Sequence, residues 1–225
     1  MFDASDTLAM LHYGDSAYPA GGFAFSWGVE GLAADGYLAG AEDLDRFVAE
    51  QLHRRWAIMD RILLLRAYLA DDLDAVASVD RLADASTPSA QMREGSRRAG
   101  KSMLGVSGRL GGPLSTAYRA RLGSDPRLGH LPVAQALSYR DAGLGRHAAQ
   151  LVSGWTLVTG LLSAAVRLGL VGFIDAQHAQ SAARADLTRL LAVEPDPQQP
   201  PASFTPLIDI AVTRGPARHI RMFST

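Results

Sequence analysis

Apolar side chains recur every three to four residues along nearly all of this chain, and that period constrains its fold most strongly. The segment 44–69 has this pattern, 71–83 repeats it, and 144–168 and 173–191 continue it. Such spacing places apolar side chains on one face of an α-helix. Alternating β-branched runs of strand length are scarce. The sequence therefore predicts an all-α, single-domain bundle of roughly eight to ten helices.

Proline and glycine mark several predicted helix ends. Ser86-Thr87-Pro88 has the pattern of an N-cap followed by a first-turn proline, which predicts a helix running to about residue 110. Gly111-Gly112-Pro113 ends that helix. Pro132 begins another helix, which Gly143 breaks.

The C-terminal region has a different composition. Residues 194–206 hold five of the eleven prolines, a density that favours an extended, solvated segment. We therefore divide the chain into a helical domain (1–193), a Pro-rich linker (194–206) and a tail (207–225). The tail is predicted to have little to bury and to be mobile in isolation.

Composition excludes several classes of protein. The 225 residues include 48% hydrophobic residues, no cysteine and a formal net charge of -1. The absence of cysteine rules out a disulfide scaffold, a thiolate nucleophile and a Cys-ligated metal centre. No basic balance indicates nucleic-acid or membrane binding. Residues 1–13 lack the pattern of a signal peptide, so we expect a cytoplasmic protein.

Residues 95–102 satisfy the pattern G-x-x-x-x-G-K-S of phosphate-binding loops. Such a loop follows a buried strand, and its backbone N–H groups and lysine bind the phosphates. Here residues 86–94 are polar and helical in pattern. Arg93, Arg97 and Lys101 fall four residues apart, on one helix face. We favour a basic face that is solvated or faces a partner. The alternative is a nucleotide-binding enzyme that uses residues 95–102.

Other motifs for catalysis or metal binding are incomplete. Ser26 stands in a segment that resembles the nucleophile elbow of serine hydrolases, but the first glycine of that motif is missing. No two histidines have the spacing H-x-H or H-E-x-x-H. We predict no catalytic residue, no metal ligand and no stably bound cofactor. The six histidines are expected to pack, cap or lie at the surface: His12, His53, His130, His147, His178 and His219.

Residues 148–166 carry no formal charge and approach the ~20 apolar residues that a membrane span needs. They lack flanking aromatic belts and basic loops, so we predict a buried core helix instead. A strip of small residues on one side is expected to permit close approach of a neighbouring helix: Ser153, Thr156, Thr159, Gly160 and Ser163.

The segment 16–30 has neither helical nor strand period and is rich in glycine and aromatic residues. Pro19 followed by Gly21 and Gly22 indicates a tight turn. Two interpretations stay open for this segment. It is either a loop anchored to the core by its aromatic side chains or a binding surface presented by a rigid turn.

The same segment resembles the N-terminal signature of the UreF family of urease accessory proteins, which reads close to S-x-x-L-P-x-G-G-F-x-x-S-x-G-L-E. The run 161–168 is similar to the family's L-V-S-A-A-V-R-L, and 130–133 is similar to a histidine-led helix entry. The signature residues that match are Ser16, Pro19, Gly21, Gly22, Phe23, Ser26, Gly28 and Glu30.

The chain departs from the family pattern in two places. Phe173 and Ile174 stand where a polar G-Q-T-x-x-Q segment is usual, and Gly215-Pro216-Ala217 replaces H-E-T in the tail. The other tail positions that correspond include Asp209, Arg214, Arg221 and Phe223.

The resemblance implies a non-catalytic, dimeric chaperone scaffold for urease. Such a scaffold joins UreD (also called UreH), recruits or regulates the UreG GTPase, and acts on urease apoprotein to insert nickel, which the complex handles. We expect the tail to become ordered on meeting UreD. The expected contact residues are Pro19, Gly21, Gly22, Phe23, Ser26, Gly28, Glu30, Arg93, Arg97, Lys101, Asp209, Arg214, Arg221 and Phe223.

Overall fold

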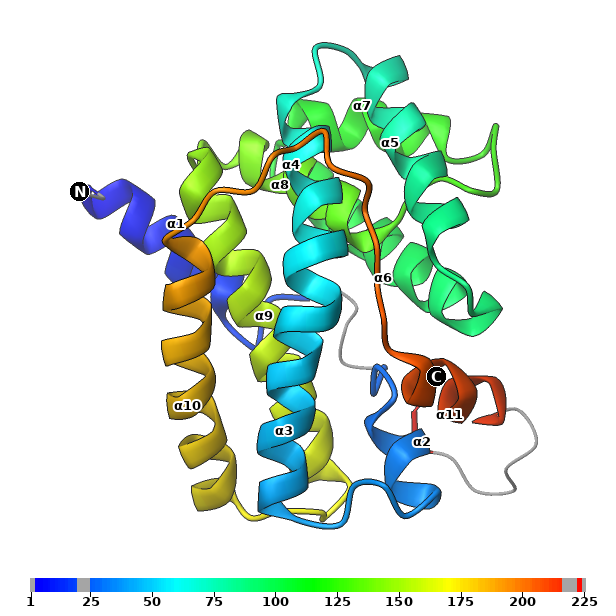
Figure 1. Cartoon of the computed structure of the whole chain (residues 1–225). Coiled ribbons are helices and arrows are strands. Elements are labelled where there is room, and N and C mark those ends of the chain that lie inside the picture. The colour runs from blue at the N-terminus through cyan, green and yellow to red at the C-terminus, as the bar shows by residue number, and fades with distance from the viewer. Residues whose placement is uncertain (1–2, 20–24, 216–221, 224–225) are drawn as a thin grey trace.

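The computed structural model describes residues 3–19, 25–215 and 222–223, and within these ranges it contains helices and no strand (Figure 1). This confirms the all-α prediction. α3, the π-helix η2 and α4 are continuous, so the described residues form ten uninterrupted helical segments. The elements are α1 (Ala4–Gly14), α2 (Val29–Ala34), α3 (Ala41–Gln51), η2 (Leu52–Asp60), α4 (Arg61–Leu69), α5 (Leu73–Ser86), α6 (Ala90–Arg109), α7 (Pro113–Arg121), α8 (Leu131–Asp141), α9 (Arg146–Arg167), α10 (Phe173–Leu191) and α11 (Pro206–Thr213).

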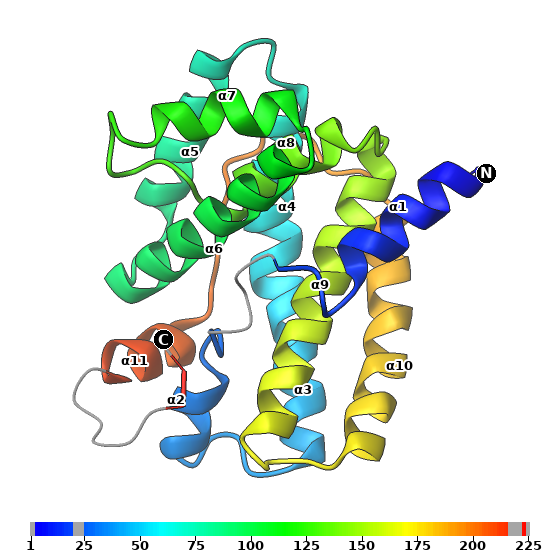
Figure 2. The same ribbon diagram turned by 180° about the vertical axis from the view of Figure 1, so that it is seen from behind.

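Two hydrophobic clusters make up most of the core, and two long helical segments, α3–η2–α4 and α9, contribute to both. One cluster joins α3, α10 and the C-terminal half of α9 to the short helices α2 and α11. The other joins α4 and the N-terminal half of α9 to α1 and α5 to α8. Figures 1 and 2 show the first group below and the second above, with α9 running through the middle.

The predicted helix ends are partly confirmed. α7 begins at Pro113, immediately after the two glycines that end α6. The expected N-cap within Ser86-Thr87, with Pro88 in the first turn, is wrong because α5 extends to Ser86 and Thr87 is its C-cap. Ser89 caps α6 instead, by accepting a hydrogen bond from the backbone N–H of Met92 at 3.3 Å. Pro88 lies in the turn between α5 and α6 and not in the first turn of α6.

Residues 194–205 form an extended strap across the long helix α3–η2–α4, as the linker composition predicts (Figure 1). The strap is attached to the helix rather than fully solvated. The N–H groups of Ala202 and Phe204 donate to the carbonyls of Ile58 and Arg54, both at 3.0 Å. Arg66 donates to three strap carbonyls, those of residues 197, 198 and 199. The strap therefore fixes where α11 begins.

A buried polar cluster holds the start of α8 against α5. The carboxylate of Asp80 accepts hydrogen bonds from the hydroxyl of Tyr118 and from the N–H groups of Gly129 and His130. Burial raises the pKa of Asp80 to about 6. Burial lowers the pKa of His130 to about 4, although its Nε2 lies 3.1 Å from Asp84 Oδ1, which acts in the opposite direction.

These two groups are expected to oppose each other in the pH dependence of stability. The unfolded chain binds a proton at His130 below about pH 6.5 and the folded chain does so only near pH 4, so His130 lowers stability as the pH falls through this range. Asp80 does the reverse between about pH 6 and pH 4, because the folded state binds its proton more tightly.

We expect His130→Gln to gain stability relative to the wild type when the pH falls from 7 to 5, by about 2 kcal/mol. Urea denaturation of both proteins at the two pH values measures this difference, in which groups common to both cancel. Equal changes in the two proteins would contradict the assignment of His130 as a buried neutral side chain.

Candidate functional site

The described part of the 16–30 segment bends sharply just before α2. Trp27 and Gly28 have consecutive positive φ angles of 51° and 98°. A side chain is strained at the second of these angles, and glycine adopts it readily. Phe25 and Ser26 are buried immediately before the bend, and the ring of Phe25 lies 5.6 Å from the guanidinium of Arg98 on α6. The described aromatic residues thus anchor the loop to the core, as the first interpretation predicts.

Helix α11 packs against this bend and against α2 at very short range. A Cβ atom at Gly28 would lie 2.7 Å from the side chain of Ile208, and one at Gly31 would lie 3.0 Å from the carbonyl oxygen of Ala211. Ile208, Ala211 and Val212 are buried. The prediction that the tail has little to bury is therefore wrong for these residues. The apolar residues of α11 have helical spacing in the sequence, but they directly follow the Pro-rich segment 194–206, which does not predict a helix.

The end of the chain returns to α2 as well. The carboxylate of Glu30 accepts hydrogen bonds from the N–H groups of Met222 at 2.5 Å and Phe223 at 3.3 Å. Phe223 is 4% exposed, and its ring lies 4.4 Å from the guanidinium carbon of Arg167 at the end of α9. We call the assembly of Gly28, Glu30 and Gly31 with α11 and Phe223 the loop–tail junction.

Two further predicted tail residues occupy different positions at this junction. Asp209 is half-buried, and its burial raises the pKa of its carboxyl, an effect that the charge of Arg55 opposes. Arg214 is exposed and lies 3.6 Å from the carboxylate of Asp35 at the end of α2. Gly21, Gly22, Phe23 and Arg221 lie outside the described residues, as does most of the substituted Gly215-Pro216-Ala217.

The predicted basic face of α6 is divided in the structure. Arg93 donates to the carbonyls of Thr87 and Pro88, and Arg97 forms an ion pair with Asp84. Lys101 is exposed. Arg93 and Arg97 thus bind the end of α5. They would have to give up these contacts before binding a partner protein.

The phosphate-binding alternative is contradicted by the same helix. Residues 95–102 lie inside α6, with Gly95 and Gly100 buried. Their backbone N–H groups belong to a helix interior and do not form a loop after a strand, which a phosphate cradle requires. Gly100 serves packing instead, because a Cβ there would lie 2.1 Å from the carbonyl oxygen of Gly129.

A cavity of about 480 Å³ lies beside α9 and is lined on another side by residues 13–19, Phe25 and Trp27. Thr156, Thr159 and Ser163 line it, and a Cβ at Gly160 would meet nothing within 4 Å. The expectation that this strip permits close helix packing is therefore wrong for most of its length. The close approach occurs at Gly154, where a Cβ would lie 2.5 Å from Leu187.

The described residues offer no obvious reaction centre. They contain no group of three or more His, Cys, Asp or Glu side chains placed to hold a metal ion. Ser26 is fully buried, so its hydroxyl does not face solvent as a nucleophile at an elbow would. α9 has the length and apolarity of a membrane span, yet 56% of its most apolar window is buried inside the protein, as in a core helix.

Glu30 should hold the C-terminal residues in place. Glu30→Ala removes the acceptor of two backbone N–H groups, while Asp209→Asn keeps an acceptor on the same junction and serves as the control. We expect the Glu30 variant to be cleaved by trypsin after Arg214 several times faster than the wild type, with a loss of about 1 kcal/mol in stability. An unchanged cleavage rate would show that Glu30 does not retain this segment.

Sequence reasoning missed Gly31, Ile208 and Arg167, which complete the junction. The i, i+3 spacing of Ile208 and Ala211 was a usable signal, but nothing in the sequence pairs that face with Gly28 and Gly31. The described residues thus form an all-helical protein. In it, the 16–30 segment and the tail, which are far apart in the chain, pack against each other.

Comparisons with known proteins agree with this description. A family model for UreF matches residues 38–184. The urease accessory protein UreF of Trichodesmium erythraeum is 30% identical over 99% of this chain and 98% of its own length. The urease accessory proteins UreF of Yersinia pestis and Yersinia enterocolitica are each 26% identical over 99% of both chains. This chain belongs to the UreF family, and its similarity to urease accessory proteins extends over nearly its whole length.

Proposed function

We propose that this protein is a non-catalytic scaffold in the maturation of urease. It acts in the cytoplasm as a homodimer, joins UreD (UreH), recruits or regulates the UreG GTPase, and takes part in inserting nickel into urease apoprotein. Nickel is cargo of the assembled complex in this proposal. The family membership supports the pathway, and the loop–tail junction supports a role through protein contacts.

The loop–tail junction is the observation that carries the proposal for this chain. It joins two of the segments in which the sequence resembles the UreF family, 16–30 and the tail, through the contact of Gly28 with Ile208 and the hydrogen bonds to Glu30. The exposed side chains of Leu207 and Ile210 leave apolar surface on the outer side of α11. Such surface beside a packed helix suits a partner that recognises a preformed structure.

This arrangement changes the mechanism expected for the tail. Because α11 is already helical and packed on α2, UreD would meet a formed surface at this helix and would pay little ordering entropy there. The proposed contact residues Glu30, Arg214 and Phe223 would then act by holding α11 in place. Arg93 and Arg97 would act by fixing α6 against α5.

Co-expression tests the proposal. The tagged chain should co-purify with UreD, UreG and urease, and it should restore urease activity in cells that lack their own UreF. Ile210→Asp places a charge on the outer side of α11 and should abolish capture of UreD, whereas Leu69→Asp changes an exposed apolar residue on α4 and should not. Turnover of a substrate by the purified chain, or full activation by the Ile210 variant, would contradict the proposal.

A further inference from the structure

The hairpin of α6 and α7 carries most of the described cations that have no partner among the described residues. Among the described residues, five Lys and Arg side chains form no ion pair or hydrogen bond with another described residue: Arg54, Lys101, Arg109, Arg119 and Arg184. Three of them, Lys101, Arg109 and Arg119, belong to this hairpin. Other arginines nearby are neutralised, since Arg81 and Arg121 pair with aspartates.

Two of these cations, Arg109 and Arg119, line one groove, and Lys101 lies further along α6. Gly108, Arg109, Thr116 and Arg119 line an open groove of about 420 Å³ between the two helices. Lys101 and Arg109 are eight residues apart on α6, about 12 Å along the helix and about 80° apart around it. Gly105 lies between them, and the guanidinium of Arg119 lies over it, 3.5 Å from where a Cβ would be.

Glycine explains why the groove exists. A Cβ at Gly108 would lie 2.9 Å from the hydroxyl of Thr116, so the helices approach closely at this point. Because Gly105 has no side chain, the guanidinium of Arg119 lies directly over α6 at that residue. Leu110 follows Arg109 at the end of α6, is 62% exposed and adds apolar surface next to that arginine in the chain.

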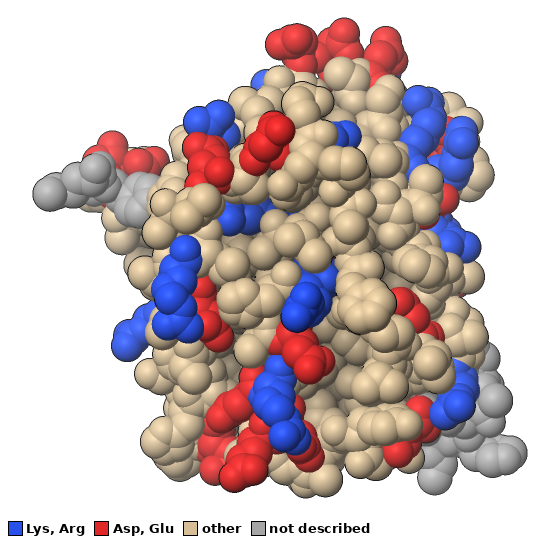
Figure 3. Space-filling model, in the orientation of Figure 1, with Lys and Arg blue, Asp and Glu red and all other residues tan. Residues whose placement is uncertain are grey.

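The hairpin lies on the face shown in Figure 2, where α6 and α7 are in front. Figure 3 shows the opposite face, over the strap, α3 and α10. There acidic and basic side chains are interspersed (Figure 3). Because the chain as a whole carries a net charge of -1, the unpaired positive charge of the hairpin is a local feature and not a property of the whole surface.

We propose that the α6–α7 groove binds an acidic segment of a partner protein, with carboxylates spaced about one helical turn apart and an apolar residue that covers Leu110. Three separated cations on a shallow surface match several carboxylates along a chain. A small anion would need donors that converge in an enclosed site, and the groove is open. This inference concerns a surface apart from the loop–tail junction and does not depend on the proposed function.

The test uses the full chain and a fluorescein-labelled synthetic peptide with glutamates at every fourth position, alanines between them and one leucine. Anisotropy titrations are made at 0.15 M salt, where charges further apart than about 8 Å are largely screened. The test variant is Arg109→Glu with Arg119→Glu. The matched control is Arg54→Glu with Arg184→Glu, which makes the same change in net charge away from the groove.

We expect the groove variant to bind the peptide at least tenfold more weakly than the wild type and the control to bind within about twofold of it. Circular dichroism and the thermal midpoint verify that both variants fold. Undetectable binding to the wild type, or equal losses in both variants, overturns the proposal. It is also overturned if a thymidine 12-mer binds the groove more tightly than the peptide, or if 10 mM inorganic phosphate displaces the peptide while 10 mM chloride does not.

Discussion

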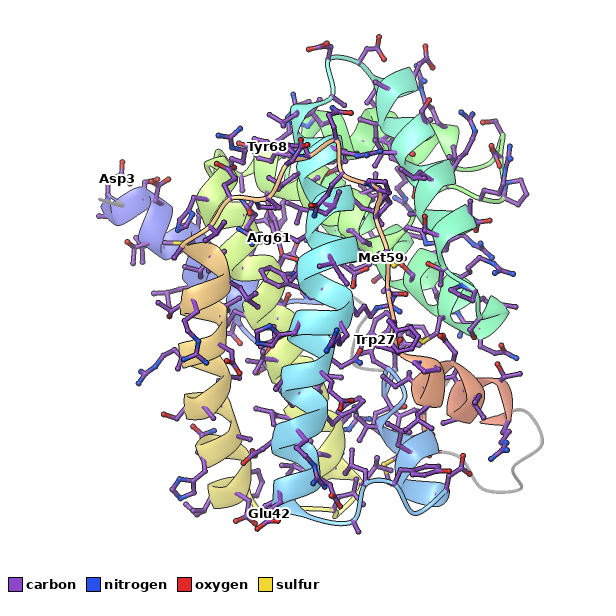
Figure 4. All side chains as sticks on the ribbon, in the orientation of Figure 1. Asp3, Trp27, Glu42, Met59, Arg61 and Tyr68 are labelled. Carbon is purple, nitrogen blue, oxygen red and sulfur yellow. The ribbon has the colours of Figure 1, made fainter. Side chains whose placement is uncertain are left out.

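Replacing Arg61 with methionine is expected to lower the free energy of unfolding by about 3–5 kcal/mol, because this buried cation connects three parts of the chain. Its Nε donates to Gln150 Oε1 at 2.6 Å. Its two terminal nitrogens donate to the carbonyls of Leu190 at 2.8 Å and Val193 at 3.0 Å. Arg61 is labelled in Figure 4. Methionine fills similar volume but donates nothing, so three acceptors lose this donor, and the carbonyl of Leu190 keeps only the N–H groups that follow it, such as that of Val193 at 3.4 Å.

The environment of Arg61 supports this magnitude. The residue is 3% exposed, its guanidinium lies 5.5 Å from the ring centre of Trp56, and burial lowers its pKa from the ordinary value. The last carbonyls of α10 have no partners within that helix, and Arg61 supplies one at the point where the strap begins. Removing Arg61 should therefore loosen the strap as well as the core.

Urea denaturation of Arg61→Met measures the effect, and Arg46→Met is the matched control. Arg46 lies on α3 of the same long helical segment, pairs with Asp43, and has a side chain that is 73% exposed. Exposed pairs of this kind contribute at most about 1 kcal/mol. A loss of similar size in both variants would show that Arg61 does not connect the helices as described.

The second large effect is expected at Gly100. Gly100→Ala should destabilise the protein by about 3 kcal/mol, although alanine normally stabilises a helix relative to glycine. The new Cβ would lie 2.1 Å from the carbonyl oxygen of Gly129 and 2.9 Å from the carbonyl carbon of His130. Both are backbone atoms at the start of α8, so α6 and that connection must separate.

Gly160→Ala is the matched control, because Gly160 lies within α9 and a Cβ there would meet nothing within 4 Å. That variant should be stabilised by about 0.5–1 kcal/mol. Thermal and urea denaturation of the two variants should thus give changes of opposite sign. Two changes of the same sign would contradict the close contact of α6 with the residues before α8. Lys101→Ala, beside Gly100, should leave stability nearly unchanged.

The helical periods were sufficient to predict the main helices. The residues of 144–168 and 173–191 form α9 and α10 nearly as the pattern indicates, since burial of an apolar face decides both the period and the structure. The π-helix η2 was not predicted, because the apolar period of 44–69 continues through it. The short helices α2 and α11 were not predicted either, because helices of this length depend on tertiary packing, here of α2 on α9 and α11 and of α11 on α2 and α6.

For the candidate site too, the sequence identified the residues but not their contacts. The sequence singled out the 16–30 segment, residues 209–223 and the charges of α6, because glycine, aromatic, proline and basic residues at those positions are unusual locally. Whether they meet is a long-range property. Glu30 and Phe223 are almost the full length of the chain apart, and the strap brings them together.

The sequence by itself determined that this protein is helical and where its long helices lie, because both follow from the local spacing of apolar residues. It also determined that the 16–30 segment and the region after residue 193 differ from the rest in composition. Only the tertiary structure decided the rest. It placed Gly100 against the backbone of Gly129 and paired Arg93 and Arg97 with the end of α5. It also left a cavity beside Gly160 and three described cations unpaired on α6 and α7. Each of these depends on which surfaces pack together, and the energy of packing is shared between residues that are distant in the chain.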